Sequence, residues 1–194
     1  MLKGWFTMDF IQNLDAQILL YIQEHFRTQF LNTFFVGFTH LGDGGILWIC
    51  ISLILMIFRK TRRIGFVCAV SLMIGALVTN VTLKNIVARP RPFDTIQDLT
   101  ILIKYPTDYS FPSGHTTSWF ASGTSMFLML NKKYSYVFLM LASIMGFSRL
   151  YVGVHYPTDV LCGLMIGVFS TIISYNIIRV IYKNRELKLT NHMD

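Results

Sequence analysis

Charged residues are scarce in this sequence of 194 residues. Only 14% of the chain is Asp, Glu, Lys or Arg, whereas 53% is hydrophobic. Soluble globular domains carry about 25% charged residues, so the composition argues against a soluble protein. It predicts instead one integral membrane domain that occupies residues 1–194.

Cysteine is also rare. Cys50, Cys68 and Cys162 each lie inside an apolar run, and none has the CxxC or Cys/His spacing of a metal site. This pattern excludes a zinc-ribbon type of protein and does not support a disulfide framework. We expect the three thiols to act as apolar side chains in the core or against lipid.

Acidic residues are outnumbered by basic ones, 10 against 17, which gives a net charge of +7. The basic residues occur in short clusters between apolar runs rather than along one polar face, so nucleic acid is not expected as a partner. Membrane topology explains them better, because short cytoplasmic loops are rich in Lys and Arg. The clusters are Arg59, Lys60, Arg62 and Arg63; Lys132 and Lys133; and Arg179, Lys183, Arg185 and Lys188.

Long apolar runs, by contrast, are plentiful and predict an all-α membrane bundle of about six spans. A span needs about 20 mostly apolar residues. The run at 116–130 contains Ser, Thr and Gly, which suits a helix packed against other helices. The runs cover residues 30–41 (short), 46–58, 64–83, 116–130, 134–147 with an extension to 154, and 160–182; an amphipathic interfacial helix is expected at 10–22.

Six spans place all three basic clusters on one side, with both termini in the cytoplasm. The segment from Lys84 to His115 then lies on the outer side, and its stretch 89–111 predicts an extended, proline-rich loop. Long loops in compact domains are often functional.

Three outer stretches carry ionisable residues, which the positive-inside rule does not explain. Each such residue near a span costs about 2.5 to 3.5 kcal/mol on insertion scales, so a functional site is the default hypothesis. The stretches are KNIVARPRP with Lys84 and Arg91, PSGH at 112–115, and SRLYVGVHYPTD at 148–159 with Arg149, His155 and Asp159.

These residue types fit a phosphate group. The planar forks of Arg91 and Arg149 match phosphate oxygens two at a time, and Lys84 adds a point charge. PSGH enters a helix, whose free N–H groups and positive dipole end favour an anion. Gly114 would let the backbone approach the ligand, and Ser113 could donate a hydrogen bond to it.

His155 and Asp159 complete a candidate catalytic group. Proline favours the first helical turn, so a helix should begin at about Pro157 and let Asp159 reach back to His155. A carboxylate on one imidazole nitrogen leaves the other free to attack, and His115 could protonate the leaving oxygen. A single histidine near a helix end is more often structural, so the hypothesis depends on the whole set; the pattern names no partner for His25, His40 or His192.

Together these motifs resemble the three-part signature of the type 2 phosphatidic acid phosphatase family of membrane lipid phosphatases. They read K-x6-RP from Lys84 to Pro92, PSGH, and SR-x5-H-x3-D from Ser148 to Asp159. RPRP offers two registers, and the family spacing from Lys84 selects Arg91 over Arg89.

The resemblance implies a phosphatase that needs no metal or cofactor and forms a phosphohistidine at His155. Lys84, Arg91, Ser113, Gly114 and Arg149 would bind phosphate, and His115 and Asp159 would assist. It also implies a lipid substrate at the outer face of the cell membrane: undecaprenyl diphosphate, phosphatidylglycerophosphate or phosphatidate. A transporter or channel with an anion site, or a haloperoxidase-like enzyme, are the alternatives, and oligomeric state is left unspecified.

Overall fold

The computed structural model describes residues 2–190, with the side chains of residues 10–185, and every regular element among them is a helix. The fold is therefore all-α, as the sequence predicts. In chain order the elements are α1 (Leu2–Phe26), α2 (Gln29–His40), η1 (Asp43–Gly45), α3 (Ile46–Ile57), α4 (Arg62–Ala76), η2 (Leu77–Leu83), α5 (Lys84–Val87), α6 (Pro92–Thr95), α7 (Gly114–Met129), α8 (Lys132–Tyr151) and α9 (Pro157–Thr190).

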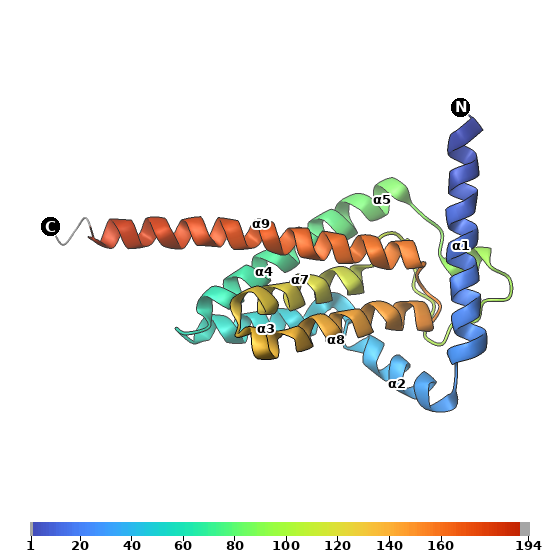
Figure 1. Cartoon of the computed structure of the whole chain (residues 1–194), viewed down its shortest axis with the longest axis horizontal. Helices are drawn as coiled ribbons and strands as arrows, with labels where there is room; N and C mark the ends of the chain where they lie inside the picture. Colours follow the sequence, from blue (N-terminus) through green and yellow to red (C-terminus); the bar gives the residue numbers. More distant parts are fainter. Residues whose placement is uncertain (1, 191–194) are drawn as a thin grey trace.

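Helix α7 lies at the centre of the bundle and packs against α4, α8 and α9 (Figure 1). Its residues from Thr116 to Met126 are almost all buried, including Ser122 and Ser125. A Cβ atom at Gly163 of α9 would lie 2.7 Å from the Ser113 carbonyl oxygen, so glycine allows α9 to approach this closely. The prediction that 116–130 packs against helices rather than lipid is confirmed.

Among the residues that the structure describes, two stretches, Arg62–Thr95 and Pro157–Arg185, are long and apolar enough to cross a membrane, or three if the pair α2 and α3 forms one bent span. The predicted pair of separate spans at 30–41 and 46–58 is wrong. The chain bends by only 43° between α2 and α3, so it continues in roughly the same direction. Gly44 and Gly45, at φ 60° and 67°, provide the left-handed backbone of this bend.

The bend joins two of the predicted six spans into one, and the side of the membrane on which each terminus lies stays a prediction. Helix α1 crosses one end of the bundle, while α9 runs to the opposite end (Figure 1). Near that opposite end the guanidinium of Arg63, at the start of α4, lies 5.6 Å above the ring of Tyr182 in α9.

Helix α1 contains the predicted interfacial helix at 10–22 and lies roughly perpendicular to α7, α8 and α9 (Figure 1). Phe10, Ile11 and Leu14 are exposed on it, whereas Asp15 and Leu19 are buried against the bundle. An exposed apolar face on a helix that crosses the bundle end suits the membrane interface.

Candidate active site

A cavity of about 590 Å³ opens at the end of the bundle beside the first turn of α7. The structure brings together six of the eight predicted site residues in its wall: Lys84, Arg91, Gly114, His115, Arg149 and His155. They come from three stretches of sequence that span more than seventy residues. The other two, Ser113 and Asp159, lie behind the wall.

Lys84 and Arg91 enter the cavity from the end of the α4 span. The π-helical stretch η2 directly precedes Lys84, and such wide turns are frequent at functional sites. Helix α5 ends at Ala88 in the left-handed conformation, φ 47°, which turns the chain across the bundle end. Arg91 lines the cavity and Arg89 does not, in agreement with the register selected from the Lys84 spacing.

The two arginines of the cavity are both 3% exposed. The Nη1 atom of Arg91 donates to the Val154 carbonyl at 2.7 Å and lies 3.5 Å from Nε2 of His155. The Nη1 atom of Arg149 donates to the Thr39 hydroxyl at 2.6 Å, while its Nε has no partner among the described residues. Buried guanidinium donors next to a histidine form a site for a tetrahedral anion.

Asp108, in the long loop between α6 and α7, bridges two of the cavity's cations. Its Oδ1 accepts from Nη2 of Arg91 at 2.6 Å, and its Oδ2 pairs with Lys84. Partial burial alone would raise the pKa of Asp108, but Lys84 and Arg91 outweigh burial and lower this pKa to about 2. A permanent carboxylate therefore lies between Lys84 and Arg91.

His155 lies in the short turn between α8 and α9 and is 2% exposed. Burial lowers the pKa of its imidazole to about 4, although Asp159 opposes this shift. The side chain is therefore neutral near pH 7, which a nucleophile requires. Its Nε2 faces Arg91, and its Nδ1 lies 3.5 Å from Oδ2 of Asp159.

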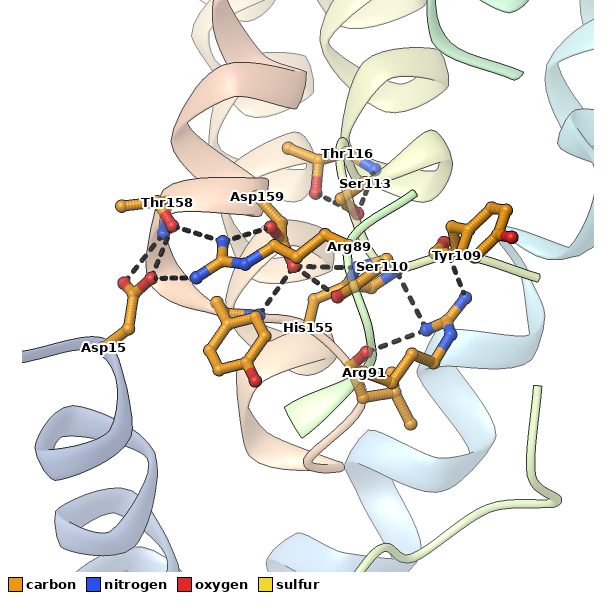
Figure 2. Close-up of polar contacts among 12 residues, drawn as sticks. Asp15, Arg89, Arg91, Tyr109, Ser110, Ser113, Thr116, His155, Thr158 and Asp159 are labelled. Atoms are coloured by element: carbon orange, nitrogen blue, oxygen red, sulfur yellow. Dashed lines mark hydrogen bonds and ion pairs between the residues drawn. The ribbon is translucent and has the colours of Figure 1, made fainter. Parts of the chain in front are cut away.

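Helix α9 begins at Pro157 as predicted, so Asp159 occupies its first turn. Its Oδ2 accepts from the Ser110 hydroxyl at 2.5 Å and from the Tyr156 N–H at 2.9 Å. Its Oδ1 accepts from Nη1 of Arg89 at 2.7 Å (Figure 2). The carboxylate is held by three donors besides its contact with the imidazole.

His115 occupies the opposite wall, where the bend between α2 and α3 backs it. Its Nε2 lies 3.1 Å from Oδ1 of Asp43, and Oδ2 of Asp43 lies 2.8 Å from Nδ1 of His40. A Cβ atom at Gly42 would lie 2.4 Å from Cδ2 of His115, so any larger residue there would displace the imidazole. His40 thus has a partner that the sequence pattern did not name.

Gly114 begins α7 at the cavity wall, as expected for close backbone approach to an anion. Ser113 is its N-cap, and the serine hydroxyl accepts from the Thr116 N–H at 3.4 Å and from the Thr116 hydroxyl at 2.9 Å. Ser113 is buried and does not line the cavity, and its predicted hydrogen bond to phosphate stays a prediction.

Residues 64–183 match the PAP2 superfamily. The chain belongs to the PAP2 superfamily. The matched part begins in α4, so α1, α2 and α3, with Asp15, Thr39 and Asp43, lie outside it.

Individual PAP2 relatives agree with this match. The chain is 35% identical over 132 residues to the undecaprenyl-diphosphatase of Sulfolobus acidocaldarius, an alignment that covers 68% of this chain and 63% of the relative. It thus spans less than two thirds of that relative's length.

Two solved structures share the fold. One is LpxE from Aquifex aeolicus, with a TM-score of 0.74 and 30% identity over 84% of this chain and 95% of that one. The other is a PAP2 type phosphatidylglycerolphosphate phosphatase from Bacillus subtilis, with a TM-score of 0.71 and 27% identity over 90% and 87% of the two chains.

Proposed function

We propose that this protein is a phosphatase that removes the terminal phosphate from a membrane lipid, and that the lipid is an isoprenoid diphosphate of the undecaprenyl diphosphate class. The observation that carries the proposal is the convergence of Lys84, Arg91 and Arg149 on a neutral, buried His155 in one cavity. The PAP2 match and the undecaprenyl-diphosphatase relative support it.

A diphosphate is favoured over a monoester by the charge of the cavity wall. Lys104 lines the cavity in addition to the three cations nearest His155, so four cations and two carboxylates, Asp43 and Asp108, lie in its wall. A terminal diphosphate carries more negative charge than a phosphomonoester and gives this fourth cation a partner. Phosphatidylglycerophosphate is the second candidate, because a phosphatase of that name shares the fold at 27% identity.

The reaction takes two steps. Nε2 of His155 attacks the terminal phosphorus, the bond from that phosphorus to the bridging oxygen breaks, and the lipid monophosphate that leaves takes a proton from His115. Burial and Arg149 lower the pKa of His115 to about 3, whereas Asp43 and the negative charge of a bound diphosphate favour its protonated form, so His115 acts as the acid when the substrate is bound. Water then attacks the phosphohistidine, His115 accepts the water proton, and inorganic phosphate leaves. Lys84, Arg91 and Arg149 stabilise the charge on the equatorial oxygens in both steps.

The cavity end of the bundle would face the outside of the cell membrane. The support is the basic end that lies away from the cavity, where short cytoplasmic loops are expected. A cysteine placed at Asp98 should react with an impermeant thiol reagent in intact cells, whereas one at Lys132 should not. The opposite labelling would overturn this orientation.

The function is tested with a panel of purified lipids in detergent: undecaprenyl diphosphate, phosphatidylglycerophosphate and phosphatidate, each with and without EDTA. We expect the highest kcat/KM for the diphosphate and no effect of EDTA. A higher kcat/KM for phosphatidylglycerophosphate would show that the substrate is a phospholipid monoester and not an isoprenoid diphosphate. Loss of activity with EDTA would refute a metal-free mechanism. Vanadate-dependent halide oxidation without phosphate release would establish the haloperoxidase alternative.

A further inference from the structure

Arg89, which does not line the cavity, joins two buried carboxylates. Its Nη1 donates to Oδ1 of Asp159 at 2.7 Å, and its Nη2 donates to Oδ2 of Asp15 at 2.8 Å (Figure 2). The side chains of Asp159 and Asp15 are 0% and 3% exposed, and that of Arg89 is 15% exposed. The guanidinium also lies 3.8 Å above the Tyr156 ring.

Asp15 brings α1 into this network. Its Oδ1 accepts from the Thr158 N–H at 3.1 Å and its Oδ2 from the Thr158 hydroxyl at 2.5 Å. Thr158 precedes Asp159, so one carboxylate from α1 contacts both Arg89 and the first turn of α9. Asp15 lies outside the segment that matches the PAP2 superfamily.

The charges of this network are unequal. One guanidinium serves two carboxylates, so the group of Asp15, Arg89 and Asp159 carries a net charge of −1 beside His155. A buried charge that loses its partner is strongly unfavourable, so each member constrains the other two. A neighbouring negative charge also favours imidazolium, so the net charge of the group acts on the protonation of His155.

We propose that Asp15 and Arg89 are positioning residues for the phosphatase reaction. They fix Asp159 against His155 and set the net charge that His155 experiences. The interfacial helix α1 is thereby a working part of the active site and not only a membrane anchor. The inference rests on the proposed role of His155 as nucleophile.

Other ionisable groups also face His155 and Asp159, and they are the same in every variant of the test. They are Arg91, Arg149 and His115 near His155, Asp108 on Arg91, Asp43 on His115, and Tyr156 and Cys162 near Asp159. None belongs to the group of three whose charge is varied.

The test compares kcat/KM against pH for wild type, Asp15→Asn, Arg89→Gln and the double variant. The group's net charge is −1 in wild type, 0 in Asp15→Asn, −2 in Arg89→Gln and again −1 in the double variant. The pH midpoint of the acid limb of kcat/KM should rise as the net charge of the group becomes more negative. It should move to higher pH in Arg89→Gln by roughly half a unit or more, move to lower pH in Asp15→Asn, and return to the wild-type midpoint in the double variant.

A matched control separates charge from docking of α1. Gln23 also ties α1 to the outer loop, since its Nε2 donates to the Asp98 carbonyl at 2.9 Å and its Oε1 accepts from the Thr100 N–H at 2.8 Å. Gln23→Ala should leave the acid limb in place. Asp15→Asn should lower kcat by about tenfold with little change in KM, because the phosphate-binding cations are untouched.

A double variant whose acid limb lies further from wild type than either single variant, or a Gln23→Ala shift equal to that of Asp15→Asn, would overturn the positioning role. Should Arg89→Gln fail to fold, the double variant and Asp15→Asn still decide, because their predicted midpoints differ. His155→Ala is assayed in parallel: full turnover there refutes the proposed function, whereas an inactive His155→Ala with unshifted limbs refutes only this inference.

Discussion

Nδ1 of His155 lies 3.5 Å from Oδ2 of Asp159, and that same oxygen accepts hydrogen bonds from Ser110 at 2.5 Å and the Tyr156 N–H at 2.9 Å. Protein hydrogen bonds between nitrogen and oxygen are usually 2.7 to 3.2 Å long, so the imidazole is the weakest of these contacts. Asp159 is thus fixed by other groups first and presents a fixed negative charge to His155.

Asp159→Asn should therefore lower kcat by roughly 10³-fold, because an amide of the same shape no longer favours the tautomer that leaves Nε2 free. KM should change little, since Asp159 does not line the cavity. Steady-state kinetics in detergent measures both constants. A variant that keeps kcat within threefold of wild type would show that the charge of Asp159 is not used.

Asp108→Asn should bind inorganic phosphate or vanadate severalfold more tightly than wild type. The Asp108 carboxylate occupies Lys84 and Arg91 and, with its pKa lowered to about 2, stays charged throughout any assay. An anionic ligand must compete with it. Inhibition constants for vanadate measure the effect, and weaker inhibition would mean that Asp108 instead holds the two cations in position.

His115→Ala should lower kcat strongly for phosphatidate, whose alkoxide leaving group needs a proton, but far less for p-nitrophenyl phosphate, whose leaving group needs none. Asp43→Asn should show the same pattern more weakly, by about tenfold, because Asp43 contacts the imidazole rather than the substrate. Equal losses on both substrates would argue against general acid catalysis from this wall of the cavity.

The acid limb of kcat/KM should lie near pH 4 once the titration of the substrate is subtracted, because burial lowers the pKa of His155 to about 4. The same shift makes the free energy of unfolding depend on pH. Between about pH 6.5 and 4 the unfolded chain binds a proton at His155 that the folded protein does not, so stability falls as the pH is lowered through this window. The pH dependence of Tm in wild type and His155→Gln measures it, and identical slopes would contradict the shifted pKa.

Much of the site could be predicted because its residues lie at helix ends that the sequence marks. Pro157 marks the start of α9 and Ser113 that of α7, and both motifs reach the same end of the bundle. Asp15, Asp43 and Asp108 could not be found this way, since they reach the site only through tertiary contacts.

The prediction of separate spans at 30–41 and 46–58 is wrong for a similar reason. Two apolar runs separated by HLGDGG are equally compatible with a reversal and with a bend, because Gly44 and Gly45 can adopt either backbone path. The contact between His115 and Asp43 accompanies the bend, and it joins residues 72 apart in sequence. Only the packed bundle distinguishes the two paths.

The central claim is that His155 becomes covalently phosphorylated. The most direct measurement mixes the enzyme with a lipid diphosphate that carries ³²P in its terminal phosphate. The reaction is stopped rapidly without acid, and the labelled peptide is mapped. The account predicts acid-labile label on the peptide that contains His155, at up to one phosphate per chain, and no label in His155→Ala. Label on another residue, or full turnover by His155→Ala, would contradict it.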